Sequence, residues 1–550
     1  MFIDLRGSNN EVFQVRLSRE TFPNLDELVK LKPESVISVK GIVVQRKEDD
    51  YNAGLRTGKI ELETSELEIL NLSKTLPFEI KRAAKSNENV RFQYKFLDHR
   101  NDEVRKAIVN RHRVIKLMRD ILDEEEFLEI ETPILTAGTD EGAREFIVPT
   151  RKQAGSFYTL PQAPQQFKQM LMVGGFEKYF QIARCFRDED SRGDRQPEFT
   201  QLDIEMAYAS MQQIIDLNTK MFNEIVRKIY GITYKDAMDK YGCDRPDLRF
   251  GLEMQDITEI VKDTTFQVFS KPIDEGGIVK CIKVSAEEQG NKRMSKGQIE
   301  NLTAIAQQHG LGGLAYIFVN ENDLQSPIIK FLGEEIAANI IKATDAQVGD
   351  IVFFSAADYA TANKALDAVR QEMGRILKLI NPKELRPAWV VDFPMFEKTE
   401  EGRWTFTHNP FSMPAIYDLE KHMTGNDDEI GTIIAQQYDL ILNGYEIGGG
   451  SVRAHKSEIL EATYKNMGYN KEEMIKSVGT MYKAFQYGAP PHGGIAWGVD
   501  RLMMILEKKA SIREVMAFPK TGSSEDLLFN APSILSDKKV EEMNVKIIRN

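Results

Sequence analysis

The chain has 550 residues, more than one hydrophobic core usually organises, so two to four domains are expected. Its hydrophobic fraction of 42% and charged fraction of 28% are typical of a soluble globular protein. The net charge of −12 argues against non-specific coating of nucleic acid, and three dispersed cysteines argue against structural zinc and disulfides. Because the sequence shows neither a signal-peptide pattern nor a long apolar run, we expect a cytoplasmic protein.

Short alternating segments fill residues 1–70 and predict a small β-barrel domain. The segments are Phe2–Arg6, Val12–Arg16, Ser35–Gln45 and Lys59–Leu67, with a short helical pattern over Leu25–Leu31. The polar residues 71–89, which include Pro77, predict a hinge.

A long amphipathic pattern follows the hinge. Apolar residues at helical spacing predict a helix over Asp102–Glu125, which leads into a strand over Phe127–Leu135. Pro133 within this strand indicates an edge or a bulge. The next loop, Thr136–Arg144, consists mainly of small residues and carries Glu141.

A second amphipathic helix is expected over Leu160–Gln169, where proline marks the start. Gln165 and Lys168 are three residues apart and share a face of this helix. Because the next residues, Met170–Gly175, are mostly apolar, Lys168 is expected to need an anionic partner. The carboxylate of a substrate would be such a partner.

Lys178–Met206 predicts two strands joined by a highly charged loop. One face of this hairpin is mostly apolar, whereas the other ends in Arg187 and carries Phe199 and Gln201. An arginine can bind a phosphate or carboxylate with two parallel hydrogen bonds, and a phenylalanine offers a flat face to a base. The pattern alone also fits a plain solvated hairpin.

Residues 258–386 interrupt the pattern of the surrounding chain and predict an independent α+β module without a ligand cluster. Its expected strands are Ile278–Val284, Gly313–Val319 and Asp350–Ser355, and its expected helices are Lys296–His309, Leu332–Lys342 and Ala360–Leu379.

Two carboxylates, Asp439 and Glu446, lie on either side of the turn sequence Asn443–Gly444. A hairpin through this turn could bring them together, and two carboxylates beside a triphosphate can hold Mg²⁺. The glycines Gly448–Gly450 would let a ligand approach the backbone closely. Arg453 follows as a candidate fork for a carboxylate.

Two further candidates come from the same half of the chain. His408 lies on a loop fixed by proline, and Arg501 begins an apolar helix directly after Gly498–Asp500. An unpaired guanidinium in an apolar environment would be costly, so Arg501 is expected to face a nucleotide.

These stretches resemble the class II aminoacyl-tRNA synthetases, in the form of the bacterial aspartyl enzymes. FRDED followed by RQPEFTQLDIE resembles motif 2, Phe127–Leu135 resembles motif 1, and GVDR resembles motif 3. Residues 258–386 resemble the GAD insertion, and FIDLR…VFQV resembles the anticodon-binding OB-fold. The resemblance covers most of the chain.

The resemblance implies a multidomain α/β and β protein built on an antiparallel sheet flanked by helices. The implied segments are a partial OB-fold (1–70), a hinge (71–89), the two halves of the catalytic core (90–257 and 387–530), the insertion (258–386) and a C-terminal extension (531–550). Compared with the family, one strand before FIDLR is expected to be missing, either by truncation or natively.

The resemblance also implies roles for individual residues. Catalysis would fall to Arg187, Glu446 and Arg501. L-Aspartate would contact Glu141, Gln165, Lys168, Arg187, His408 and Arg453. ATP would contact Arg187, Asp188, Glu189, Gln196, Phe199, Glu446, Gly498, Val499, Asp500 and Arg501, with adenine between Phe199 and Arg501. Mg²⁺ would bind Asp439 and Glu446, and the tRNA anticodon would contact Phe2 and Gln14.

The implied activity is that of an aspartate–tRNA ligase, which uses ATP with Mg²⁺, binds tRNA(Asp) and forms a homodimer through motif 1. Whether tRNA(Asn) is also charged stays open. Two alternatives remain: an aspartate-activating amide ligase resembling ammonia-dependent asparagine synthetase, and a non-catalytic RNA-binding paralogue.

Overall fold

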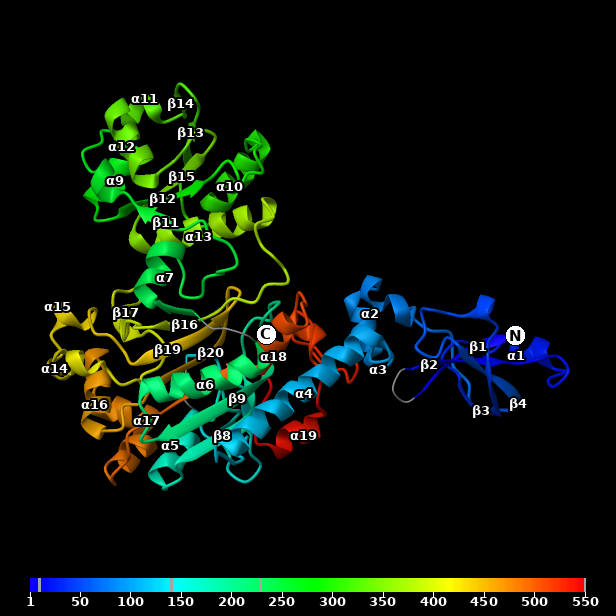
Figure 1. Cartoon of the computed structure of the whole chain (residues 1–550). Coiled ribbons are helices and arrows are strands. Elements are labelled where there is room, and N and C mark those ends of the chain that lie inside the picture. Colours follow the sequence, from blue (N-terminus) through cyan, green and yellow to red (C-terminus); the bar gives the residue numbers. More distant parts are fainter. Residues whose placement is uncertain (8–10, 139–141, 227–229, 549–550) are drawn as a thin grey trace. The chain divides into compact units, whose positions relative to one another are not determined.

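The computed structural model describes residues 1–7, 11–138, 142–226 and 230–548 (Figure 1). They form two compact units, which are described separately: residues 1–113 with 190–196 and 513–535, and residues 114–189 with 197–512 and 536–550. Within the described part of the chain, no helix is both long and apolar enough to cross a membrane.

The first unit contains a four-stranded sheet in the order β1-β2-β4-β3. Its elements are β1 (Phe2–Arg6), β2 (Val12–Arg16), α1 (Leu25–Leu28), β3 (Val36–Gln45) and β4 (Ile60–Asn71). β2 and β4 run parallel, and the other neighbours run antiparallel. Leu17, Leu25 and Leu28 form a small apolar core, which α1 helps to cover.

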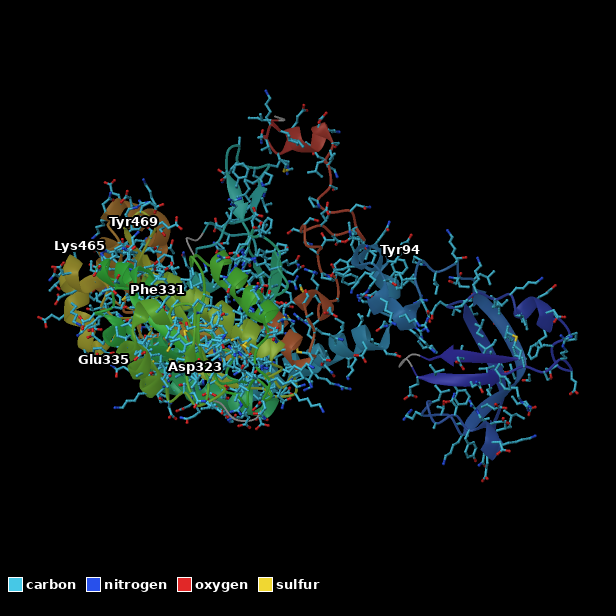
Figure 2. All side chains as sticks on the ribbon, turned by 90° about the horizontal axis from the view of Figure 1, so that it is seen from above. Tyr94, Asp323, Phe331, Glu335, Lys465 and Tyr469 are labelled. Carbon is cyan, nitrogen blue, oxygen red and sulfur yellow. The ribbon has the colours of Figure 1, made fainter. Side chains whose placement is uncertain are left out.

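Short helices follow this sheet in the first unit: a 3-10 segment (Ile80–Lys85), α2 (Glu88–Gln93) and α3 (Lys95–Asp98). Fully buried Asp98 accepts hydrogen bonds from Arg91 (2.9 Å) and Lys95 (2.7 Å), which ties α2 to α3. Tyr94, labelled in Figure 2, lies between these two helices.

The second unit contains an eight-stranded sheet in the order β10-β16-β19-β20-β21-β9-β8-β5. The strands are β10 (Tyr230–Thr233), β16 (Pro387–Val391), β19 (Gln437–Leu442), β20 (Tyr445–Val452), β21 (His492–Gly498), β9 (Glu198–Ala207), β8 (Lys178–Phe186) and β5 (Leu128–Glu129). All neighbours are antiparallel except the pairs at the two edges, β10–β16 and β5–β8.

Helices and short hairpins accompany this sheet. They are α4 (Asp102–Glu124, which begins in the first unit), α5 (Gln165–Val173), α6 (Met211–Ile225), α14 (Leu419–Thr424), α15 (Asp427–Ile430), α16 (Ser457–Asn466), α17 (Lys471–Phe485), α18 (Val499–Leu506) and α19 (Asp537–Glu542), with the hairpins β6 (Ile147–Pro149)/β7 (Phe157–Thr159) and β17 (Phe396–Lys398)/β18 (Trp404–Phe406). The predicted strand Phe127–Leu135 is wrong in length: within it, the strand β5 comprises Leu128–Glu129. Pro133, which cannot donate a ladder hydrogen bond, lies beyond it.

The alternation of β9 assigns the two faces of the large sheet. Leu202 and Ile204 are fully buried on the face where α6 packs, and there Asn218 of α6 accepts a hydrogen bond from Trp497 Nε1 at 2.8 Å. The other face carries Phe199, Gln201, Asp203 and Glu205. The predicted assignment of these side chains to opposite faces is therefore confirmed.

The insertion module has its own five-stranded sheet, in the order β11-β12-β15-β13-β14. Its elements are β11 (Met254–Asp256), α8 (Thr258–Val261), α9 (Gln267–Asp274), β12 (Ile278–Val284), α10 (Lys296–Gln308), β13 (Ala315–Val319), β14 (Leu324–Gln325), α11 (Ile329–Leu332), α12 (Glu334–Thr344), β15 (Ile351–Ala357) and α13 (Tyr359–Ile376). The helix α7 (Tyr234–Tyr241) precedes the module and packs on the large sheet through Ala237, and β11 lies before the predicted boundary at residue 258. Apolar cores lie on both faces of this sheet, and Figure 2 labels Phe331 and Asp323 in this module.

Candidate active site

The strand register brings small residues to the middle of one sheet face. Across the sheet, Asp203 of β9 lies opposite Ala496 of β21, which lies opposite Gly449 of β20, which lies opposite Asp439 of β19. Side chains at directly opposed positions point to the same face. The two central positions of this row hold only alanine and glycine. The face is therefore open in the middle, with an acidic side chain at each end of the row.

A buried group of two cations and two carboxylates occupies the next part of this face. Lys168 Nζ of α5 lies 2.7 Å from Asp203 Oδ1 and 3.1 Å from Glu205 Oε2. Arg453 donates from Nε to Glu205 Oε1 (3.0 Å) and from Nη2 to Glu205 Oε2 (3.3 Å). All four residues are at most 2% exposed. The protein itself thus supplies anionic partners for Lys168, so its burial alone does not require an anionic ligand.

The charges in this group control the ionisation of Glu205. Burial opposes ionisation, but the positive charges of Arg453 and Lys168 outweigh it and lower the pKa of Glu205 to about 2. For Asp203, burial dominates over the charge of Lys168 and raises the pKa. Glu205 is therefore the firmly ionised member, and it holds the two cations in place.

Asp439 and Glu446 come together as the hairpin prediction requires. Asn443 and Gly444 form the turn between β19 and β20, with φ of 53° and 86°. A Cβ atom built on Gly449 would lie 2.9 Å from Asp439 Oδ1, 3.1 Å from Glu446 Oε1 and 3.1 Å from His408 Cε1. These three side chains therefore surround one point above Gly449, where any side chain larger than hydrogen would intrude.

Asp439 is buried with one carboxylate oxygen that has no hydrogen-bond partner among the described residues. The residue is 5% exposed, and the oxygen concerned is Oδ1. Burial, reinforced by the nearby Glu446 carboxylate, raises the pKa of Asp439 well above its ordinary value. A buried acceptor in this state is stabilised by a cation or a hydrogen-bond donor from a ligand.

Arg187 and Phe199 lie together at the end of the β8–β9 hairpin. The guanidinium carbon of Arg187 is 5.2 Å from the centre of the Phe199 ring, and its buried Nε has no hydrogen-bond partner among the described residues. The two following residues, Asp188 and Glu189, are exposed and half-buried, respectively. The Asp188 N–H donates to Arg144 O at 2.9 Å.

The start of α18 contributes a second set of predicted site residues, Gly498–Arg501. Arg501 is half-buried and donates from Nη1 to the Glu446 carbonyl. Gly498 lies opposite Gln201 in the β21–β9 ladder, whereas the Val499 side chain is fully buried. Asp500, predicted as an ATP contact, accepts a hydrogen bond from the Thr200 N–H at 2.7 Å and so links α18 to β9.

The remaining predicted residues are placed as follows. Gln165, at the start of α5, has a buried Nε2 without a hydrogen-bond partner among the described residues. Glu141 lies outside the described residues. Gln196 belongs to the first unit, where its Oε1 accepts from the Lys520 N–H at 2.9 Å. Phe2 and Gln14 lie on one face of the β1–β2 pair, and Phe2 is 61% exposed.

Comparison with known proteins decides the family. A family model for class II tRNA synthetases (D, K and N) matches residues 87–522. The chain belongs to this family. Along its whole length it is 44% identical to an aspartate–tRNA(Asp/Asn) ligase of Syntrophomonas wolfei and 43% identical to one of Bacillus subtilis, covering 94% and 93% of those proteins. It is also 42% identical over its whole length to an aspartate–tRNA ligase of Shouchella clausii, of which it covers 94%.

Solved structures agree on the fold of this synthetase. A putative aspartyl-tRNA synthetase from Leishmania major superposes with a TM-score of 0.55 at 18% identity, covering 94% of this chain and 86% of the other. An asparaginyl-tRNA synthetase from Pyrococcus horikoshii gives a TM-score of 0.54 at 18% identity, covering 94% and 91%. The expected class II architecture is confirmed.

Four residues of the site were not predicted as site residues from the sequence: Asp203, Glu205, Ser451 and Gly494. Ser451 Oγ accepts from Arg453 Nη1 at 2.8 Å, and a Cβ atom on Gly494 would lie only 2.2 Å from Glu205 Oε2. The period of two along β9 placed Asp203 and Glu205 on the ligand face, which is the signal that could have identified them.

Proposed function

We propose that this synthetase is an aspartate–tRNA ligase, which activates L-aspartate with ATP and transfers it to the 3′ end of tRNA(Asp). The observation that carries the proposal is the pair of buried cations, Lys168 and Arg453, aligned by Asp203 and Glu205. Relatives over the full length of the chain are named aspartate–tRNA ligase or aspartate–tRNA(Asp/Asn) ligase. The first 70 residues are included in these matches, which disfavours the amide ligase without an anticodon domain.

The hydrogen-bond inventory of the two cations supports selection of a carboxylate. The contacts among the described residues use two of the three N–H groups of Lys168 and four of the five of Arg453. One N–H of Lys168 Nζ and one of Arg453 Nη1 remain for a ligand. Two donors satisfy both oxygens of an aspartate side chain, whereas the NH₂ group of asparagine would face a donor.

Mg²⁺ fits the carboxylates Asp439 and Glu446. The described residues contain no group of three or more His, Cys, Asp or Glu side chains arranged to hold a metal. Mg²⁺ commonly binds through one or two carboxylates and completes its shell with water and substrate phosphates. The unpartnered Asp439 Oδ1 beside Glu446 matches that pattern. When bound there, the ion would neutralise charge on the ATP phosphates.

ATP would lie between the two sides of the site. We place adenine between the Phe199 ring and the Arg501 guanidinium, where stacking and a cation–π contact would hold it. Glu189 would contact the adenine edge, and Arg187, through its unpartnered Nε, would bind the α-phosphate or the aspartate α-carboxylate. Gln165 and His408 would contact the amino acid.

The reaction needs no protein nucleophile. An oxygen of the aspartate α-carboxylate attacks the α-phosphorus of ATP, the bond to the β-phosphate oxygen breaks, and pyrophosphate leaves with its electron pair. Arg187 would stabilise the developing charge while Arg501 holds the adenine, so catalysis consists of positioning and electrostatics. The ribose hydroxyl of tRNA then attacks the aspartyl carbonyl and releases AMP.

Several features of the proposal lie outside the catalytic site. The four-stranded domain would bind the anticodon, with Phe2 stacking on a base and Gln14 hydrogen bonding to one. The protein would form a homodimer through the region of α4 and β5. Its location would be cytoplasmic. Two of the relatives named above are ligases for tRNA(Asp/Asn), so charging of tRNA(Asn) belongs to the test.

The test is aspartate-dependent ATP–pyrophosphate exchange together with charging of tRNA(Asp) and tRNA(Asn) transcripts. We expect exchange with aspartate but not with asparagine, and charging of tRNA(Asp). Exchange without charging, combined with asparagine formation when ammonium is added, would replace the proposal with the amide ligase. A lack of both activities would leave the non-catalytic paralogue.

A further inference from the structure

Asn443 has more contacts than a turn residue needs. Asparagine before glycine is favoured in a two-residue hairpin turn because it tolerates positive φ, and no side-chain contact is required for that. Here the side chain is 7% exposed, and both ends of its amide are used. Oδ1 accepts from the Arg386 N–H at 2.9 Å, and Nδ2 donates to the Glu384 carbonyl at 3.0 Å.

The segment that Asn443 binds is one of the two connections of the insertion module. Residues 381–386 lead from the end of the module into β16, the neighbour of β19. The turn is therefore tied by its side chain to the exit of the insertion, in addition to the backbone ladder of the sheet.

The entry connection reaches the same turn. A Cβ atom on Gly444 would lie 3.3 Å from Asp247 Cβ, so the chain at Asp247 packs directly against the turn. Arg370, a fully buried residue of α13, donates from Nη2 to the carbonyls of Asp247 (2.8 Å), Phe250 (3.1 Å) and Gly251 (3.0 Å). The helix of the insertion module thus fixes the entry connection.

The Asn443–Gly444 turn also determines how Asp439 and Glu446 lie relative to each other. Glu446 lies opposite Ile441 and Asp439 lies opposite Gly449, and the register shifts between Leu440 and Ile441. Because of this shift, Glu446 and Gly449, three residues apart on β20, lie on the same face, which brings Glu446 beside Asp439. Movement of the turn, which ends just before Glu446, would therefore displace Glu446 relative to Asp439, whereas Glu205 lies on β9, with β21 between it and β20.

We propose that Asn443 is a positioning residue for the Asp439–Glu446 pair, and that the insertion module, through Asn443 and Arg370, holds these carboxylates in the geometry that Mg·ATP requires. The proposal rests on the function proposed above. It gives the insertion a role in the ATP half of the site and none in aspartate selection.

The test compares Asn443→Gly with the wild-type protein by isothermal titration of Mg·ATP without aspartate, and of aspartate alone. Glycine adopts positive φ at no cost but lacks the amide, so the turn persists while the tether is lost. We expect Mg·ATP affinity to fall about tenfold, as is typical when support of a metal ligand is removed, with aspartate affinity unchanged. In pyrophosphate exchange, KM for ATP should rise while KM for aspartate stays constant.

Asn291→Gly is the matched control, since Asn291 is an exposed residue of the insertion with φ of 55° and no part in the tether. It should leave both affinities unchanged. Asn443→Asp retains the acceptor for Arg386 but loses the donor to Glu384, so it should weaken Mg·ATP binding in the same direction. It provides the measurement if Asn443→Gly does not fold.

Unchanged Mg·ATP affinity in either folded Asn443 variant overturns the proposal, as does an equal loss of aspartate affinity. A wild-type protein that binds Mg·ATP but shows no aspartate-dependent exchange would overturn the proposed function alone, since the binding comparison does not use aspartate. A wild-type protein that does not bind Mg·ATP would overturn both.

Discussion

Arg453 and Glu205 form a buried bidentate pair, with Arg453 Nε and Nη2 donating to the two carboxylate oxygens of Glu205 at 3.0 and 3.3 Å. Gly494, opposite Glu205 in the ladder, leaves the room that this pair occupies. The guanidinium is therefore already oriented by the protein, so binding of a substrate carboxylate would not carry the entropic cost of ordering it.

Arg453→Lys should weaken aspartate binding on the order of 100-fold, because lysine retains the charge but loses the planar fork and its contact with Glu205. Mg·ATP binding, which relies on Asp439 and Glu446, should change little. Separate titrations of aspartate and Mg·ATP measure this difference. Equal losses for the two ligands would place Arg453 outside the side-chain pocket.

Lys168→Leu should reduce discrimination between aspartate and asparagine, by about 3 kcal/mol if the removed charge pair is fully buried. The ratio of kcat/KM values in pyrophosphate exchange gives this quantity. The substitution also leaves Asp203 without its ammonium partner, so the double variant Lys168→Leu with Asp203→Asn restores charge balance as a control. Unchanged discrimination in both variants would remove Lys168 from the selecting role.

The sequence could predict features that depend on local pattern. The turn at Asn443–Gly444 followed from the residue types that tolerate positive φ, and the faces of β8 and β9 followed from the period of two. Both predictions agree with the structure. The sequence also indicated that Asp439 and Glu446 could meet across this turn, because the separation along the hairpin is short.

The sequence could not predict which residues neutralise the charge of Lys168. Asp203 is 35 residues away, and Glu205 is 248 residues from Arg453. Such pairs depend on how α5 packs against β9 and on the sheet order β20-β21-β9, which brings the end of β20 near Glu205; no local pattern contains either. The apolar run after Lys168 indicates that this residue is buried, but the sequence does not connect it with the acidic residues of β9, so the expected partner is the substrate.

Phe199→Ala should raise KM for ATP on the order of tenfold while leaving aspartate affinity unchanged, since stacking of a base on an aromatic ring contributes about 1–3 kcal/mol. The Phe199 ring also lies against Arg187, so part of the effect could act through that guanidinium. Phe199→Leu, which retains bulk beside Arg187 without the flat face, separates the two contributions. ATP affinity retained in both variants would exclude Phe199 from the adenine site.

His422→Phe should reduce the loss of stability at mildly acidic pH. Burial lowers the pKa of His422 below the ordinary value of 6.5, despite the contact of Nε2 with the Ile459 carbonyl. Below about pH 6.5 the unfolded chain therefore takes up a proton that the folded chain does not. The contribution of His422 to stability is complete above that pH and declines as the pH falls, by at most about 1.4 kcal/mol per pH unit.

Phenylalanine suits this comparison because the His422 ring is stacked on Phe396, with the planes 13° apart. Loss of the Nε2 contacts with the Ile459 carbonyl and Thr463 Oγ1 lowers stability equally at each pH and cancels when two pH values are compared. Thermal unfolding at pH 7.5 and pH 5.5 should show a smaller decrease in Tm for the variant than for the wild-type protein. Equal decreases would mean that His422 is protonated in the folded protein at pH 5.5.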